Sequence, residues 1–146
     1  MKLNPFSYGN AVVTQNFLNR KKPLSRVARR LASGQSSAII GEPRIGKTSF
    51  LRYIAAVENR IELYKEAGER IVFSEQDSHM FPQKFTPAQF WERALLPLKE
   101  QIIDVEPGTL LYQQYQTCKE NQFGTFTLET FFQTLKQAHL SLVLLI

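Results

Sequence analysis

Eight consecutive residues of the chain have the types and spacing of a phosphate-binding loop. They are Gly41-Glu42-Pro43-Arg44-Ile45-Gly46-Lys47-Thr48, which fit the pattern G-x-x-x-x-G-K-[ST], and Ser49 follows them. The glycines let backbone N–H groups come close to a phosphate, and the start of a following helix adds partial positive charge. Lys47 would reach the β and γ phosphates, and the Thr48 hydroxyl would ligate Mg²⁺. These residues predict a nucleotide site that uses magnesium.

The residues on either side of the loop predict the strand and the helix that position it. Residues Ser36-Ser37-Ala38-Ile39-Ile40 predict a short buried strand, and residues 48–60 carry apolar side chains at helical spacing. An ordinary glycine-rich turn ahead of a helix is the alternative interpretation. Because strand, loop and helix occur in the required order, we favour the phosphate-binding loop.

Further strands and helices are predicted along the rest of the chain. Strands are expected at residues 70–74 and 142–146. Helices are expected at residues 23–32, from Thr86-Pro87 with a kink or break at Pro97, and from residue 127. Strands that alternate with helices predict an α/β fold. A complete doubly wound sheet usually has about five strands or more, so we expect an incomplete sheet.

The composition is that of a folded protein without a disulfide or a metal cluster. The 146 residues are 43% hydrophobic and 12% aromatic, which is enough for a core. With Cys118 as the single cysteine and only His79 and His139, neither an internal disulfide nor a cluster of soft metal ligands is expected. No apolar run approaches the length of a membrane span. We therefore expect a cytoplasmic protein with no membrane partner.

Positive charge is concentrated near the start of the chain. The formal net charge is +5, and six basic residues lie within eleven positions: Arg20, Lys21, Lys22, Arg26, Arg29 and Arg30. Such a run could attract nucleic acid. However, apolar residues at 24, 27, 28 and 31 form a helical stripe, which puts the basic side chains mainly on the opposite, solvated face. We favour a solvated face or a charged partner surface, and nucleic acid stays open as the less favoured partner.

Asp77, His139 and Cys118 are weaker candidates for chemistry. Asp77 follows the strand at 70–74, where it would either touch metal-bound water beyond a triphosphate or cap a turn, and we favour the cap. His139 precedes the last strand and is expected in solvent or bonded to a loop rather than on a ligand. Cys118 is expected in a polar helix or loop, without a base that would make it a nucleophile.

Four segments together carry a resemblance to a known family. They are the opening Asn4-Pro5-Phe6-x-x-Gly9, the loop from Gly41 to Ser49, the helix start Thr86-Pro87-Ala88-Gln89-Phe90-Trp91, and the apolar run from Leu142 to Ile146. With these segments nearly the whole chain resembles the bacterial AAA-like signal-transduction ATPases, the STAND class of P-loop NTPases. The resemblance implies a three-layer αβα P-loop fold that binds ATP with Mg²⁺, switches conformation and hydrolyses ATP slowly.

Two departures from the family pattern change what we expect of this chain. Residues 17–24 resemble the family's motif near the adenine, but Asn19 replaces Gly and Pro23 replaces Glu. Arg20 is retained, so the resemblance places it on the adenine side of the nucleotide. The Asp-Glu pair that ends the family's last strand has no counterpart here. We therefore expect an α/β P-loop sheet truncated after the Walker B strand, which binds nucleotide without turnover by this chain alone.

The expected organisation is an N-terminal segment with the adenine-side motif at residues 1–22 and an incomplete P-loop NTPase domain at residues 23–146. The favoured function is ATP binding by the N-terminal fragment of a signalling ATPase, with a protein effector or self-association as partner. A nucleic-acid-associated helper ATPase that uses the basic first helix and an inactive truncated fragment remain as alternatives. The implied sheet order puts a missing strand between residues 36–40 and 142–146, so we expect the isolated chain to be marginally stable or aggregation-prone.

Overall fold

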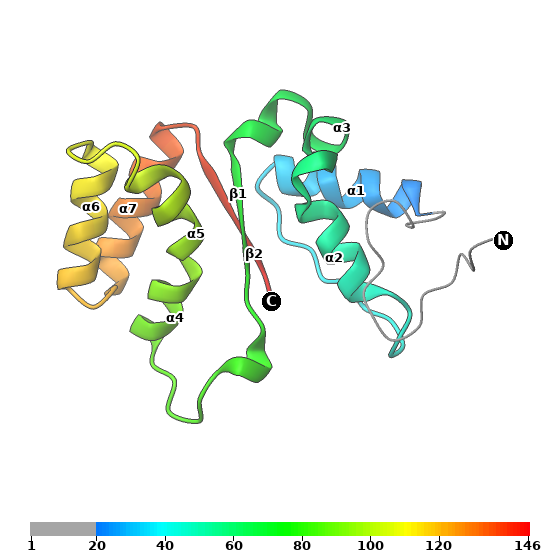
Figure 1. Cartoon of the computed structure of the whole chain (residues 1–146), viewed down its shortest axis with the longest axis horizontal. Helices are drawn as coiled ribbons and strands as arrows, with labels where there is room; N and C mark the ends of the chain where they lie inside the picture. Colours follow the sequence, from blue (N-terminus) through cyan, green and yellow to red (C-terminus); the bar gives the residue numbers. More distant parts are fainter. Residues whose placement is uncertain (1–19) are drawn as a thin grey trace, which may run out of the picture. The chain divides into compact units, whose positions relative to one another are not determined.

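The computed structural model describes residues 20–146, and the chain divides into two compact units, residues 1–69 and 70–146. The expected motifs at Asn4 to Gly9 and at Phe17 to Asn19 lie outside the described residues. Residues 20–146 have a mixed α/β structure that is mostly helical, with a two-stranded parallel sheet (Figure 1). No helix within them is long and apolar enough to cross a membrane.

The described part of the first unit is built from helices. They are α1 (Lys21–Ala32), α2 (Lys47–Ala55) and α3 (Arg60–Tyr64), with 3-10 segments at Val57–Asn59 and Lys65–Arg70. Leu24 and Ala28 on α1 are buried, which confirms the apolar stripe expected on this helix. They belong to a small group of buried apolar residues that also includes Phe50, Ile54 and Tyr64. Through these residues α1, α2 and α3 pack against one another.

The strand expected at residues 36–40 is not formed. Residues 35–42 run from α1 to the glycine-rich loop without helix or strand. Within the described chain, the backbone of residues 37–40 makes no backbone hydrogen bond, and Ile40 is 93% exposed. An apolar run becomes a strand only where a neighbouring strand supplies partners for its N–H and C=O groups. The strand prediction is wrong for residues 36–40, and the described residues of their own unit contain no strand that could pair with them.

Helix α2 ends at Ala55, although the apolar spacing predicts that it continues to residue 60. The next residue, Ala56, has extended backbone with φ −61 and ψ 132. The Asn59 side chain Nδ2 donates to the Tyr53 carbonyl at 2.9 Å, and the Tyr64 hydroxyl donates to the Ile54 carbonyl at 2.7 Å. Side chains therefore satisfy carbonyls that another helical turn would otherwise have bonded, and the chain turns back.

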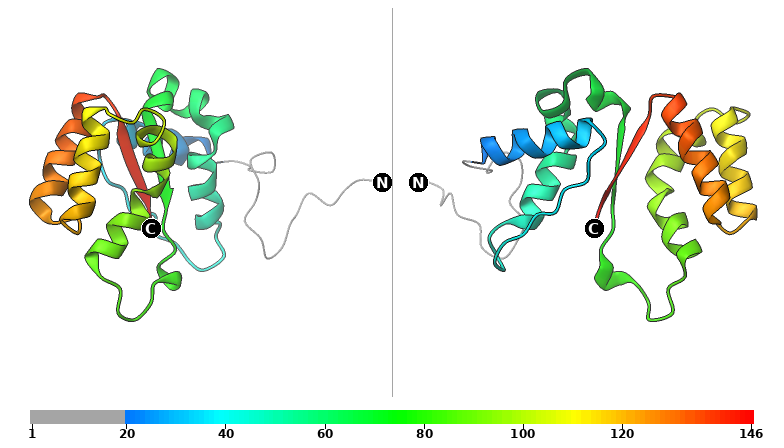
Figure 2. Two further views of the ribbon diagram at one scale, coloured as in Figure 1. Left: turned by 60° about the vertical axis from the view of Figure 1, so that its left-hand side comes forward. Right: turned by 180° about the vertical axis from the view of Figure 1, so that it is seen from behind.

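The sheet lies in the second unit. Strands β1 (Ile71–Glu75) and β2 (Ser141–Leu145) pair in parallel with Phe73 opposite Val143, and they lie side by side in Figures 1 and 2. The Gln76 backbone N–H extends the ladder by donating to the Leu145 carbonyl at 2.7 Å. Both strands lie within one residue of the predicted positions, so these two predictions are confirmed.

The helices of the second unit form the crossover that two parallel strands require. They are α4 (Pro87–Ala94), α5 (Leu96–Leu98), α6 (Leu110–Glu120) and α7 (Thr125–Gln137), with a 3-10 turn at Ser78–Met80 and a π turn at Lys99–Ile103. They lie on one side of the sheet (Figure 2). The predicted helix start at Thr86-Pro87 is confirmed, and Thr86 forms a reciprocal capping box with Gln89 there. A break in the helix is also present, but it lies at Leu95, two residues before Pro97.

The core of the second unit is larger and more continuous than the group of buried residues in the first. Leu98, Cys118 and Phe131 are fully buried in it, and Val72 of β1 belongs to the same cluster. Cys118 therefore lies on a helix, α6, which is one of the two expected positions, but its side chain is buried in the core. Its Sγ–H donates to the Thr127 carbonyl at 3.1 Å, and burial raises the pKa of its thiol. It acts as a small apolar side chain between α6 and α7.

Candidate nucleotide-binding site

The backbone of the glycine-rich loop has the turns that its sequence predicts. Gly46 has φ 93, in the left-handed region that favours glycine, and Arg44 also has a positive φ of 63. The Ile45 N–H donates to the Glu42 carbonyl at 3.4 Å and closes a turn around Pro43. A Cβ added at Gly41 would lie 3.0 Å from the Ile45 side chain. Both glycines thus allow the chain to curve tightly before α2 begins.

Lys47 lies folded over the loop. Its Nζ donates to the carbonyl of Gly41 at 2.7 Å and to the carbonyl of Glu42 at 2.8 Å. The ammonium group is therefore held at the first residues of the loop by two neutral acceptors. A phosphate oxygen is a stronger acceptor for an ammonium group than a neutral carbonyl, because that hydrogen bond gains a second charge. An arriving phosphate can take over these contacts without moving Lys47 to another part of the molecule.

The start of α2 leaves its positive end without a protein anion. Gly46 is the N-cap residue, no side chain caps the helix, and no acidic residue lies in its first turn. The backbone N–H groups at the start of a helix carry partial positive charge and bind anions. Lys47, Thr48 and the helix terminus therefore combine in one place the groups that favour a phosphate.

The two hydroxyl residues after Lys47 lie in different environments. Thr48 is exposed at the start of α2, whereas Ser49 is buried and 6% exposed. Thr48 is therefore the hydroxyl that an ion outside the loop can reach. Mg²⁺ keeps several waters and takes ligands from the substrate phosphates, so a single protein hydroxyl fits its needs. Within residues 20–146 no group of three or more His, Cys, Asp or Glu side chains could hold a metal ion.

Arg20 lies against the loop. Its guanidinium donates to the Ile45 carbonyl, and the same group is 3.8 Å from where a Cβ on Gly46 would lie. The family resemblance places this residue on the adenine side, but its partner in the structure is loop backbone. The exposed residues Glu42, Pro43 and Arg44 complete the predicted set. Arg20 is the N-cap residue of α1, and the other predicted site residues form one continuous segment from Gly41 to Ser49.

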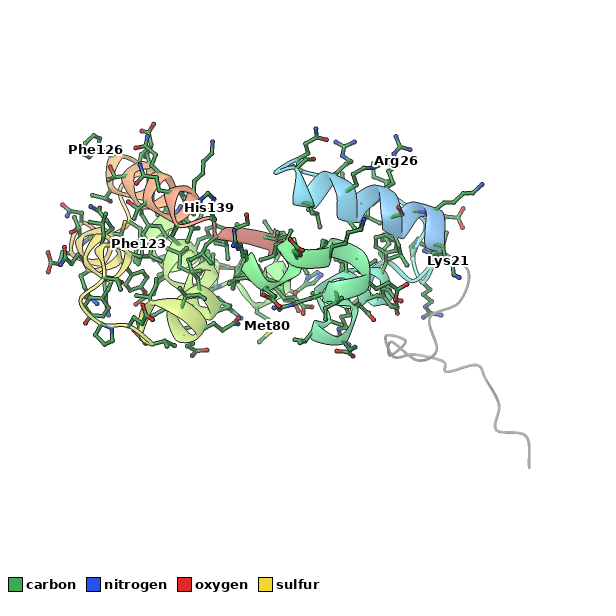
Figure 3. The ribbon with its side chains drawn as sticks, turned by 90° about the horizontal axis from the view of Figure 1, so that it is seen from above. Lys21, Arg26, Met80, Phe123, Phe126 and His139 are labelled. Carbon is green, nitrogen blue, oxygen red and sulfur yellow. The ribbon has the colours of Figure 1, made fainter. Side chains whose placement is uncertain are left out.

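The other sequence candidates lie away from the loop along the chain. The Asp77 carboxylate accepts a hydrogen bond from the His79 backbone N–H at 2.9 Å, so it caps the 3-10 turn at Ser78–Met80 and the capping interpretation is confirmed. His139 is exposed at the end of α7, and its backbone N–H donates to Lys136 (Figure 3). Both residues lie in the second unit, whereas the loop lies in the first.

One residue that supports the loop escaped prediction. Tyr64 is 4% exposed, and its hydroxyl bonds the Ile54 carbonyl on α2, the helix that carries Lys47. Burial raises the pKa of this phenol to about 12, against a smaller opposing effect of the Arg60 charge. The only sign of this role in the sequence is that Tyr64 ends a segment with apolar residues at helical spacing. Tyr64 holds the end of α2 in place from the interior of the unit.

Comparison with protein-family models, with curated proteins and with solved structures finds no match to this chain. The residues and the geometry of the loop are what indicate a nucleotide site.

Proposed function

We propose that this chain binds ATP with Mg²⁺ at the loop from Gly41 to Ser49, as the nucleotide-binding part of a signalling ATPase. The observation that carries the proposal is the position of Lys47, whose ammonium group spans the two carbonyls at the start of the loop. The helix terminus beside it lacks any acidic or capping side chain. A cation and a helix N-terminus in one loop form the arrangement that binds the phosphates of a nucleotide.

In this proposal each residue type at the loop has one task. The backbone of the loop and the start of α2 would surround the β phosphate, and Lys47 would exchange its two carbonyl partners for phosphate oxygens. Thr48 would hold Mg²⁺, which would neutralise phosphate charge when bound. Arg20 would add a second cation next to the loop. The parallel pair β1 and β2 would form part of a three-layer P-loop sheet.

The test compares two variants that lose the same charge from α2. Lys47→Ala removes the loop cation, and Arg52→Ala removes an exposed cation in the last turn of the same helix. A charge-assisted hydrogen bond contributes about 1.5 to 3 kcal/mol, so Lys47→Ala should weaken ATP binding by about tenfold to a hundredfold. Arg52→Ala should leave it within about twofold of wild type.

Isothermal titration with ATP and Mg²⁺ measures both affinities, and circular dichroism confirms that each variant keeps its helix content. Equal affinities for the wild type and Lys47→Ala would show that the loop is not the nucleotide site. The same titration with Mg²⁺ left out tests the metal. Weaker binding in its absence is expected, and Thr48→Val should reduce that dependence on magnesium.

A further inference from the structure

An open groove lies beside α1, and all of its lining belongs to the first unit. Its volume is about 510 Å³. One side is lined by the basic side chains Lys22, Arg26 and Arg30 of α1, and the other by residues 36–38. We call this cavity the basic groove. Lys47 is not among the residues that line it, so the groove is a separate feature from the glycine-rich loop.

The cations of the basic groove have no acidic partner. Helix α1 contains no acidic residue, and among the residues that the structure describes no ion pair involves its side chains. Lys22 and Arg26 are exposed, and Arg26 extends outward from the helix (Figure 3). Leu24 and Ala28 fix this orientation, because they bury the opposite face of the helix. The charges come from α1 alone, so they do not depend on whether residues 36–40 pair with a strand.

The polar side chains that line the groove can all donate hydrogen bonds. They are the ammonium group of Lys22, the guanidinium groups of Arg26 and Arg30, and the hydroxyls of Ser36 and Ser37. No acidic or amide side chain is among them. The phosphate groups of a nucleic acid present only acceptors, so they match this lining. A peptide also brings backbone N–H donors, and a cationic side chain has no acceptor for them.

No aromatic side chain lines the groove. Its remaining lining residues are Pro23, Val27 and Ala38, which are small and apolar. Sites that hold single-stranded nucleic acid stack the bases on aromatic rings. A double helix keeps its bases stacked inside and presents phosphates on the outside, so it needs no such rings. The lining therefore favours a duplex over a single strand.

We propose that the basic groove binds the phosphate backbone of double-stranded nucleic acid without regard to its sequence. The three cations recur every four residues, so from Lys22 to Arg30 they cover about 12 Å of the helix. One strand of a duplex advances about 3.4 Å per nucleotide, so this length corresponds to about three or four successive phosphates. Each cation can therefore meet a different phosphate of one strand. Phosphate contacts of this kind carry no sequence information.

The test measures binding of a fluorescein-labelled DNA duplex, two helical turns long, to the full chain by fluorescence anisotropy at several salt concentrations. Three phosphate contacts predict that the logarithm of the association constant falls with the logarithm of the salt concentration at a slope of about −2.7. Arg26→Gln should reduce the steepness of this slope by about 0.9 and weaken binding by about tenfold at 0.05 M salt. A second duplex of unrelated sequence should bind within about threefold of the first.

Lys22→Gln should repeat the loss, so the result does not depend on one variant. Both positions are exposed and glutamine is a good helix former, so circular dichroism should show unchanged helix content. Lys84→Gln is the matched control, because it removes the same charge from an exposed lysine outside α1. It should change the affinity by less than about twofold. Lys47→Ala should do the same whatever its effect on ATP, which separates the groove from the proposed nucleotide site.

Three results would overturn the proposal. The first is an equal loss of affinity in Arg26→Gln and Lys84→Gln, because net charge alone would then explain the binding. The second is tighter binding of the separated single strand than of the duplex, because the site would then hold bases. The third is a polyglutamate of equal charge that competes as well as the duplex, which would make the partner an acidic protein. An RNA duplex of the same sequence identifies the source of the phosphates, and tight binding of either duplex supports the proposal.

Discussion

The segments that follow α1 and α7 begin with the same type of helix ending, but only the segment after α7 forms a strand. After α1, the N–H groups of Gly34 and Gln35 bond back to Leu31 and Arg30. After α7, the N–H groups of His139 and Leu140 bond back to Lys136 and Leu135 in the same pattern. Gly34 and His139 both have the positive φ of this helix ending, 73 and 57. Each turn leads within two residues to a segment of five that begins with serine, Ser36-Ser37-Ala38-Ile39-Ile40 after α1 and Ser141-Leu142-Val143-Leu144-Leu145 after α7.

The two runs differ in what lies next to them. Residues 141–145 pair with β1, and Leu142 packs against the core of the second unit. Residues 36–40 find no strand to pair with among the described residues of their own unit. The two helix endings are therefore equivalent, but the run at 141–145 is apolar after its first serine, whereas the run at 36–40 begins with two serines. A strand forms where the run is apolar and a parallel neighbour lies in the same unit.

The largest loss of stability is expected from a substitution in α7, the helix that precedes β2. Phe131 on α7 is fully buried, so Phe131→Ala should destabilise the second unit by about 3 to 5 kcal/mol. Phe126→Ala on the same helix removes a ring that is 80% exposed (Figure 3), and its effect should stay within about 0.5 kcal/mol. Urea unfolding followed by the fluorescence of Trp91, the single tryptophan, measures both. Similar losses in the two variants would mean that α7 does not anchor β2 through its core face.

The next largest effect is the pH dependence of the stability of the first unit, which Tyr64 causes. The pKa of Tyr64 is raised from 10.0 to about 12 by burial, so the folded unit favours the neutral phenol. Its contribution to stability is fully present below pH 10 and is lost as the pH rises through about 12. At about 1.4 kcal/mol per pKa unit, the loss is roughly 2 to 3 kcal/mol. Tyr64→Phe should flatten this part of the pH profile.

Circular dichroism during urea unfolding, below pH 10 and again above it, checks the Tyr64 prediction. At neutral pH the same variant leaves the Ile54 carbonyl without its donor, which should cost about 1 kcal/mol. A wild type and a Tyr64→Phe variant with parallel pH profiles would show that Tyr64 ionises without unfolding the first unit. The first unit would then be held by other groups than this buried phenol.

Local signals predicted much of the fold and the loop. The cap at Thr86, the break near Pro97 and both strands of the sheet follow from turn chemistry and apolar patterns that lie within a few residues. Helix α6 was missed, although Leu111, Tyr115 and Cys118 have helical spacing, because polar residues separate them. The contact of Arg20 with Ile45 was also beyond prediction, since no local pattern links residues 25 positions apart. Prediction from the sequence thus fails where a structure depends on a partner that is distant along the chain.

The two helix endings provide a matched pair of smaller effects. Gly34→Ala places a Cβ at φ 73 with no atom within 4 Å, so backbone strain alone should destabilise the end of α1 by about 1 kcal/mol. His139→Gly relieves the same strain at φ 57 and should stabilise the end of α7 by up to about 1 kcal/mol. Hydrogen exchange of the last amides of each helix measures both. Changes of the same sign in the two variants would show that the two endings are not equivalent.

The smallest effect is expected at the exposed end of the unpaired run. Ile40→Ser removes an apolar side chain that is 93% exposed, so the free energy of unfolding of the first unit should change by less than about 0.5 kcal/mol. Leu142→Ser is the matched change in the paired run, and it should cost about 1 to 2 kcal/mol because Leu142 packs against the core. Self-association should respond in the opposite order, because an unpaired apolar segment is a site for edge-to-edge pairing. Light scattering should therefore show less aggregation for Ile40→Ser than for the wild type, and more for Leu142→Ser. If Ile40→Ser destabilises the chain as much as Leu142→Ser, then residues 36–40 pack against a neighbour in solution, and the two runs do not differ in the way described.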